Sequence, residues 1–136
     1  MPPVESPGPR RKSRAPRWTA PIIWVFVILV GTSWPDISVG PDDLIGLDKV
    51  VHFTMYAVLG ALVLRSTRTP GSRSTFVIVL CAVIVFSALD EWHQGFIPSR
   101  SASLYDWIAD ILGALTGMFA VRSTSSLAPD RQDSAS

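Results

Sequence analysis

The sequence predicts an all-α integral membrane protein, a bundle of four transmembrane helices with both termini in the cytoplasm. Three observations favour this fold: four long stretches carry almost no charge, basic residues gather between alternate stretches, and small residues recur at helical spacing. Of the 136 residues, 48% are hydrophobic and 17% are charged, whereas soluble domains carry about 25% charged residues. Because Cys81 is the only cysteine, a disulfide scaffold is excluded. The net charge of +1 gives no general attraction to nucleic acid.

The uncharged stretches are long enough, with a flanking turn, to cross a membrane. A helix needs about 20 residues to cross a hydrocarbon core roughly 30 Å thick. Only helices and closed barrels satisfy their backbone polar groups in lipid, and four strands cannot close a barrel. The alternative is a soluble all-α bundle, whose helices would show polar faces at a period of about 3.6 residues.

The first two helices are expected at about residues 18–35 and 48–66. The first is bracketed by Trp18 and Trp34, as expected of residues at the two membrane interfaces. The apolar part of the second contains one side chain that titrates near neutral pH, His52. Both stretches therefore fit membrane spans.

The last two helices are expected at about residues 74–92 and 103–122. The third is apolar until its final turn and shows no polar face, which argues against the soluble bundle. The fourth is interrupted only by Asp106 and Asp110.

Basic residues lie almost entirely on one side of the predicted bundle. Ten of the twelve Lys and Arg residues fall before the first stretch, between the second and third, or after the fourth. The positive-inside rule then places both termini in the cytoplasm. No A-x-A-like cleavage site follows the first stretch, which favours an uncleaved anchor over a signal peptide. Residues 1–17 and 123–136 are predicted to be disordered cytoplasmic tails, the first of them basic.

Polar residues follow one face of the second helix. Asp48, His52, Tyr56 and Gly60 follow one another at intervals of four and form one stripe. The glycine at its end allows another helix to approach closely. A passive membrane anchor would not need this stripe, although a hydrogen-bonded packing contact is the alternative interpretation.

The third helix ends in adjacent carboxylates, Asp90 and Glu91, followed by His93 and Gln94. Carboxylates at a helix C-terminus interact unfavourably with the macrodipole, so topology alone would not select them. A hydrated loop entrance is the alternative. Arg100 follows in the loop, and its planar donors suit a carboxylate or a phosphate. It could equally pair with a neighbouring acid.

The fourth helix carries the costliest residue. Asp106 and Asp110 share one face, and a carboxylate within the membrane costs about 2.5–3.5 kcal/mol unless it is paired or protonated. Beside them runs a small-residue stripe, Ala109, Gly113 and Gly117, which includes a GxxxG pattern. A lone GxxxG is a weak signal. Because the two stripes are adjacent, we expect both to face the bundle interior.

Two blocks of the sequence resemble the VanZ-like membrane protein family. Asp48 to Tyr56 reads DKVVHFTMY, like D-K-x-x-H-F-x-x-Y in that family. Asp90 to Arg100 reads DEWHQGFIPSR, like D-E-x-x-Q-x-F-x-P-x-R, and the following DWIADILG is like D-x-x-x-N-x-x-G. The family commonly has Asn where this chain has Asp110. Asp110 therefore cannot play the role of a neutral amide at this position unless its carboxyl group is protonated. A protonated carboxyl group would still donate a hydrogen bond.

The resemblance implies a VanZ-like four-helix domain over residues 18–122 in a bacterial cytoplasmic membrane. It also implies a cell-envelope role. The family takes its name from a protein linked to resistance against the glycopeptide teicoplanin, but membership alone does not make this chain a resistance factor. It implies no particular reaction, so whether the protein is an enzyme stays open.

The polar residues near the outer face predict a site that binds or processes a lipid-linked envelope precursor. Candidate general acids and bases are His52, Asp90, Glu91, Asp106 and Asp110. Candidate substrate-binding residues are Lys49, Tyr56, Gln94 and Arg100, with Lys49, His93 and Gln94 expected at the rim. Expected helix-packing residues are Gly60, Ala109, Gly113 and Gly117.

The main alternative is a non-catalytic interaction module that assembles through these small-residue faces, as a homo-oligomer or with another envelope protein. A third hypothesis is a divalent-metal site formed by His52, His93 and the acids. The sequence contains no H-E-x-x-H motif, so no metal and no cofactor are predicted. A transporter and a lipid phosphatase are less favoured, since the chain has neither an inverted repeat nor a P-S-G-H segment.

Overall fold

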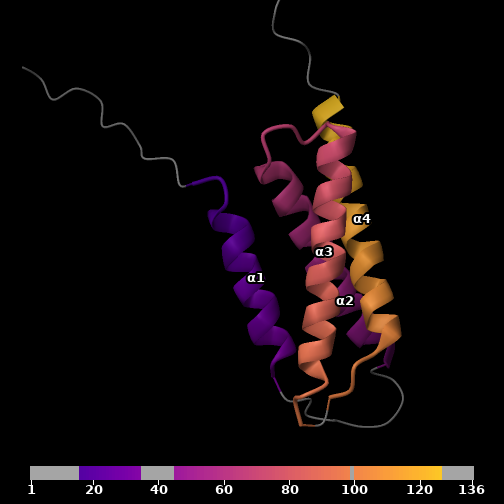
Figure 1. The fold of residues 1–136 in the computed structure, drawn as a ribbon. Helices are drawn as coiled ribbons and strands as arrows, with labels where there is room; N and C mark the ends of the chain where they lie inside the picture. Colours follow the sequence, from indigo (N-terminus) through magenta and orange to yellow (C-terminus); the bar gives the residue numbers. More distant parts are fainter. Residues whose placement is uncertain (1–15, 35–44, 99, 127–136) are drawn as a thin grey trace, which may run out of the picture.

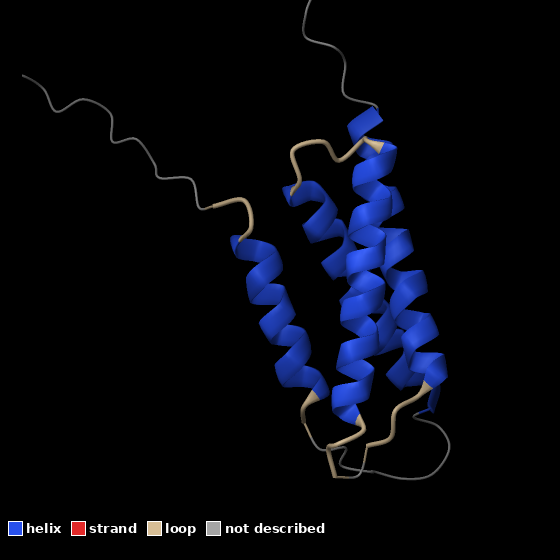
Figure 2. Ribbon diagram, in the orientation of Figure 1, coloured by secondary structure: helices blue, strands red, loops and turns tan. Residues whose placement is uncertain are grey.

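The computed structural model describes residues 16–34, 45–98 and 100–126, and these form four helices and no strand (Figure 2). The helices are α1 (Thr19–Thr32), α2 (Ile45–Ser66), α3 (Arg73–Gln94) and α4 (Leu104–Ser126). Successive helices run in opposite directions, and α1 stands at one side of the other three (Figure 1). The predicted all-α class is confirmed.

The first helix is shorter than predicted. The sequence predicts residues 18–35, whereas α1 has 14 residues, or about 21 Å at 1.5 Å per residue. At its end the Ser33 N–H donates to the Leu29 carbonyl over 3.0 Å. Trp34 precedes a proline, a position that disfavours helical backbone. Among the described residues, three helices (α2, α3 and α4) are therefore long and apolar enough to cross a membrane.

The other helices match the predicted ranges with shifted ends. α2 begins three residues earlier than predicted, and α3 extends the predicted range by one residue at its start and two at its end. α4 continues to residue 126, because hydroxyl groups of its last turn donate back to carbonyls of the preceding turn, as Ser125 does to Val121. The first residues of the predicted C-terminal tail are thus helical. Residues 1–15 and 127–136 of the predicted tails lie outside the described residues.

The most extensive contact between helices joins α2 and α4, and it depends on glycine. A Cβ atom added at Gly113 would lie 2.1 Å from the carbonyl oxygen of Phe53, and one added at Gly117 would lie 1.9 Å from that of Ala57. At Gly60 it would lie 2.6 Å from the oxygen of Ala114. The two backbones therefore touch, and these glycines pack two helices of the same chain.

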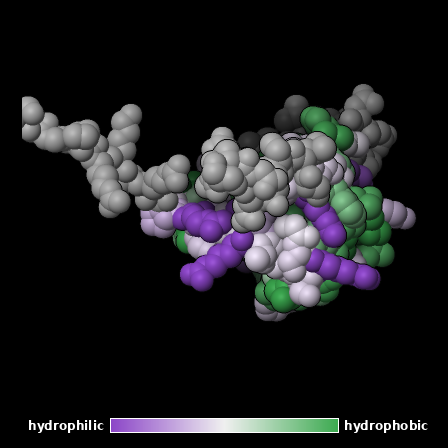
Figure 3. Space-filling model, turned by 90° about the horizontal axis from the view of Figure 1, so that it is seen from above, coloured by the Kyte–Doolittle hydropathy of each residue, from purple (hydrophilic) through white to green (hydrophobic). Residues whose placement is uncertain are grey.

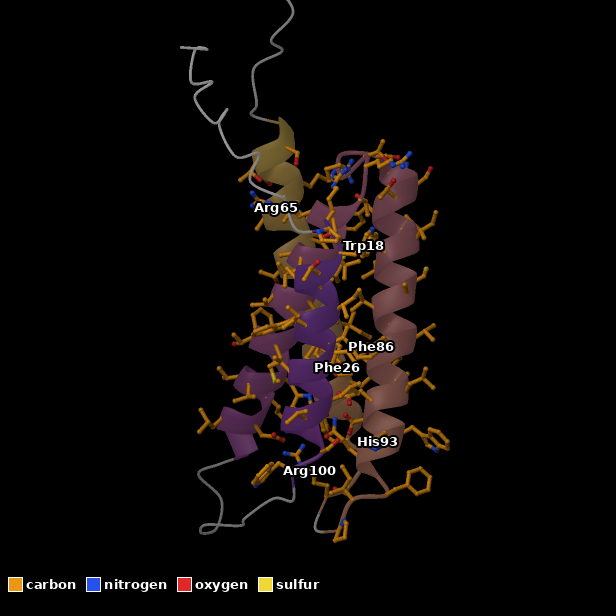
Figure 4. The ribbon with its side chains drawn as sticks, turned by 90° about the vertical axis from the view of Figure 1, so that its left-hand side faces the viewer. Trp18, Phe26, Arg65, Phe86, His93 and Arg100 are labelled. Carbon is orange, nitrogen blue, oxygen red and sulfur yellow. The ribbon has the colours of Figure 1, made fainter. Side chains whose placement is uncertain are left out.

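The core of the bundle is small, and much of its surface is apolar. Large hydrophobic side chains project outward from every helix, among them Phe26 on α1 (Figure 4), which is 63% exposed. In water such surfaces would be unfavourable, whereas in a bilayer they face the acyl chains. The outward-facing side chains therefore fit a membrane environment.

Basic side chains gather at one end of the bundle. Arg17 donates a hydrogen bond to the Thr67 carbonyl, and Arg122 lies 5.6 Å from the ring centre of Phe76. Seen from that end, hydrophilic side chains project around the helix ends (Figure 3). Arg65 lies at this end, and His93 and Arg100 lie at the other (Figure 4). The two ends thus differ in charge, as the sequence predicts.

Candidate functional site

A buried polar cluster lies at the end of the bundle that carries Arg100 (Figure 4). At its centre, His52 on α2 faces Asp110 on α4, with 3.0 Å between Nδ1 and Oδ1. The imidazole is 3% exposed and the carboxyl group is fully buried. Asp48, one turn before His52, lies 3.9 Å from Nε2 and is more exposed. The spacing of four residues on α2 places both side chains on one face.

Asp90, in the last turn of α3, accepts hydrogen bonds from three helices. Its Oδ1 accepts from Thr32 of α1 over 2.9 Å, and its Oδ2 accepts from Tyr56 of α2 over 3.1 Å. Gln94 donates to the same Oδ2 over 3.3 Å from one turn later on α3. All four side chains are buried. Three donors stabilise a carboxylate that would otherwise be costly among apolar helices.

Two cationic side chains border the cluster. Lys49 forms an ion pair of 2.9 Å with Asp106, and the lysine is about one third exposed. Arg100 is half-buried and donates to the Gln94 Oε1 over 3.0 Å. Lys49 is therefore neutralised by a carboxylate, whereas Arg100 is bonded to a neutral amide.

Three buried polar atoms of the cluster have no hydrogen-bond partner in the described part of the chain: Glu91 Oε2, Arg100 Nε and Asp110 Oδ2. The other oxygen of Glu91 accepts from the Ser103 backbone N–H in the loop before α4. Buried polar atoms are normally paired, so these atoms identify unused binding capacity.

The structure brings together the nine residues that the sequence selects as catalytic or substrate-binding candidates. They come from α2, α3, α4 and the loop between α3 and α4, at the same end of the bundle. Two expectations about the rim differ from the structure: Gln94 is buried, and His93 is exposed outside the cluster. Ala109 is half-buried beside the glycines that contact α2.

Sequence reasoning missed Thr32 and Ser103. The single hydroxyl proton of Thr32 is shared between Asp90 and the Ile28 carbonyl, each over 2.9 Å, and the carbonyl contact is one that threonine makes in many apolar helices. Its second contact, with Asp90, depends on how α1 packs, so the sequence offers no signal for it. Ser103 acts through its backbone N–H, which carries no residue-specific signal.

Two groups of side chains in the described part of the chain have the donor types and proximity to hold a metal ion. One comprises Asp48, His52 and Asp106, and the other His52, Glu91 and Asp110. In each group, one ligand atom per residue lies within 4.8 Å of the others.

Comparison with known proteins yields one match. A family model described as VanZ/LLP1 matches residues 9–125, which is most of the chain and includes all four helices up to the last turn of α4. No curated protein and no solved structure matches the chain significantly.

Proposed function

This chain belongs to the VanZ/LLP1 family, and from that premise we propose that its polar cluster binds the anionic head group of a lipid-linked cell-envelope precursor. Family membership confirms the resemblance found in the sequence. Together with three apolar helices of sufficient length, it indicates a membrane protein. We further propose that the protein lies in the bacterial cytoplasmic membrane and crosses it four times. In this proposal both termini are cytoplasmic and the polar cluster faces outward.

The observation that carries the proposal is Arg100 at the edge of the buried cluster. Its Nε is buried without a partner, and within the described residues no carboxylate lies within 4.0 Å of its guanidinium. A guanidinium with a spare donor suits the oxygens of a phosphate group. Ionisable groups among apolar helices are costly and mark functional sites by default.

Contacts at the basic end support α1 as the fourth span. Ser66 of α2 donates to the Arg17 carbonyl over 2.8 Å, and Arg17 donates to the Thr67 carbonyl. These contacts fix the start of α1 beside the end of α2. When Trp18 and the turn at Trp34 are counted with α1, the length of the apolar segment approaches the lower limit of about 17 residues for a membrane span.

Binding of an anionic lipid can be measured on the purified protein in mild detergent by native mass spectrometry, with a polyprenyl diphosphate as the probe. We expect the wild-type chain to bind the probe and Arg100→Gln to weaken binding at least tenfold, or about 1.4 kcal/mol. Arg65→Gln is the matched control, because this exposed arginine lies at the opposite end. No binding by the wild type, or equal binding by all three proteins, would contradict the proposal.

Processing of the precursor, beyond binding, would use the acids and the imidazole of the cluster. A link to teicoplanin-type resistance is part of the same proposal. It predicts that Arg100→Gln alters teicoplanin susceptibility and that Arg65→Gln does not.

The alternative module relies on the small-residue faces of α2 and α4. The backbones at Gly113 and Gly117 already contact α2 of the same chain, so these faces are occupied. The buried cluster therefore provides the stronger basis for a function.

A further inference from the structure

Three side chains of metal-ligand type, from three different helices, meet in the buried cluster. They are His52 of α2, Glu91 of α3 and Asp110 of α4, and each offers a ligand atom within 4.8 Å of the other two. We propose that these three residues bind one divalent transition-metal ion of the zinc class.

Two unpartnered carboxylate oxygens indicate that a cation completes this group. Glu91 Oε2 and Asp110 Oδ2 are buried without a hydrogen-bond donor, in side chains that are 7% and 0% exposed. Within the described residues, no Lys or Arg lies within ion-pair distance of either carboxylate. Burying two carboxylates is costly unless positive charge compensates them. One imidazole carries at most a single positive charge, whereas a divalent ion supplies two.

The spacing of the donor atoms fits a small metal ion. His52 Nδ1 and Asp110 Oδ1 are 3.0 Å apart and hydrogen-bonded, and a bound ion would replace this hydrogen bond by widening the separation to about 3.3 Å, the spacing of two ligands of a tetrahedral zinc ion. Glu91 offers its ligand atom within 4.8 Å of the other two, a distance that rotation of its flexible side chain can shorten. Three protein ligands leave one position of a tetrahedral site for water or another ligand.

The ligand types favour a transition metal over Ca²⁺ or Mg²⁺. An imidazole nitrogen suits zinc and its neighbours in the first transition row, whereas Ca²⁺ requires about six to eight oxygen ligands. The overlapping group, Asp48, His52 and Asp106, is less suited. Lys49 already neutralises Asp106 over 2.9 Å, and the side chain of Asp48 is 46% exposed.

Zinc binding can be tested on the full-length protein in detergent, after chelator treatment, by titration with Zn²⁺ against a chromophoric competitor. We expect about one Zn²⁺ per chain for the wild type. Glu91→Gln and Asp110→Asn, which preserve side-chain shape, should each weaken binding by more than about 100-fold, since loss of an outer-shell partner alone costs 10–100-fold. The Co²⁺-substituted wild type should show the visible absorption of a four- or five-coordinate ion, a result that does not depend on any variant folding.

Two controls separate the possible ligand groups. Thr116→Val removes an exposed hydroxyl group of α4 that lies outside the cluster and should leave Zn²⁺ affinity unchanged. Asp106→Asn should have a much smaller effect than Glu91→Gln, because Asp106 belongs only to the other group. Absence of Zn²⁺ binding by the wild type, or wild-type affinity in monodisperse Glu91→Gln, would overturn the proposal. The titration contains no lipid, so a failure to bind Zn²⁺ would not contradict the proposed head-group binding. Likewise, a failure to bind the lipid probe would not contradict the proposed zinc site.

Discussion

Asp90 joins three helices through single hydrogen bonds, from Thr32, Tyr56 and Gln94. Its carboxylate is 2% exposed, so water does not substitute for a missing donor. Among apolar helices, such bonds contribute to stability and also fix how the helices are arranged. The other buried acids of the cluster depend on that arrangement, since each contacts a side chain or a backbone N–H from another helix or loop.

Removing one of these donors should measurably destabilise the bundle. Tyr56→Phe deletes the hydroxyl that donates to Asp90 and retains the buried ring. Side-chain hydrogen bonds between membrane helices contribute about 0.6–1.7 kcal/mol, and we expect a loss of stability in that range. Reversible unfolding of the detergent-solubilised protein measures it. Tyr105→Phe is the matched control, because Tyr105 is 72% exposed and should tolerate the change. Equal stability of the two variants would contradict the role assigned to Tyr56.

The sequence predicts the polar residues of the cluster more readily than it predicts the partners of those residues. Spacing of four residues predicts that Asp48, His52 and Tyr56 share a face, because helix geometry is local. Their partners depend on the packing of other helices. The sequence favours no partner for Tyr56, whereas the structure pairs it with Asp90, 34 residues away. The contact between Thr32 and Asp90 spans 58 residues and was not predicted at all.

At the scale of helices, the close approach of α2 and α4 is the feature that positions the cluster. It brings His52 within 3.0 Å of Asp110 and Lys49 within 2.9 Å of Asp106. Both contacts cross the α2–α4 interface that Gly113 makes possible, where an added Cβ would meet the Phe53 carbonyl oxygen at 2.1 Å. Side-chain chemistry and backbone packing are thus linked along one helix pair.

A single methyl group at this contact should separate the two helices. Gly113→Ala should destabilise the protein by about 1–3 kcal/mol, as overpacking does in other tightly packed sites. Gly46→Ala is the matched control, because an added Cβ at this helical glycine meets nothing within 4 Å. Thermal unfolding in detergent compares the two. If Gly113→Ala instead changed the oligomeric state and left stability intact, the glycine face would serve assembly between chains.

Helix ends are less predictable than helix existence. The first stretch is free of charge from residue 18 to 35, which predicts a helix over the whole interval. Charge does not report backbone geometry, and α1 ends at Thr32, before the residue that precedes Pro35. The proline provides the local signal that would have shortened the prediction.

Over the whole molecule, charge is divided between the two ends of the bundle. Among the described residues, the basic end carries Arg17, Arg65 and Arg122, and the other end carries the acids of the cluster together with Lys49 and Arg100. This division explains how the overall charge can be only +1 while both ends are strongly polar. It was predictable because the positive-inside rule depends on chain order and charge alone. The group formed by His52, Glu91 and Asp110 was not predictable in this way, because its three members come from different helices and form no local motif.

The central claim is that the polar cluster opens outside the cell, and cysteine labelling of intact cells tests it most directly. Cys81 is replaced by serine, and a single cysteine is introduced as Ser101→Cys beside the cluster or as Ser125→Cys at the opposite end; both positions are exposed. A membrane-impermeant maleimide should label the cysteine at position 101 in intact cells and the one at 125 only after permeabilisation. Labelling of position 125 in intact cells, with protection of position 101, would place the cluster in the cytoplasm and contradict the account.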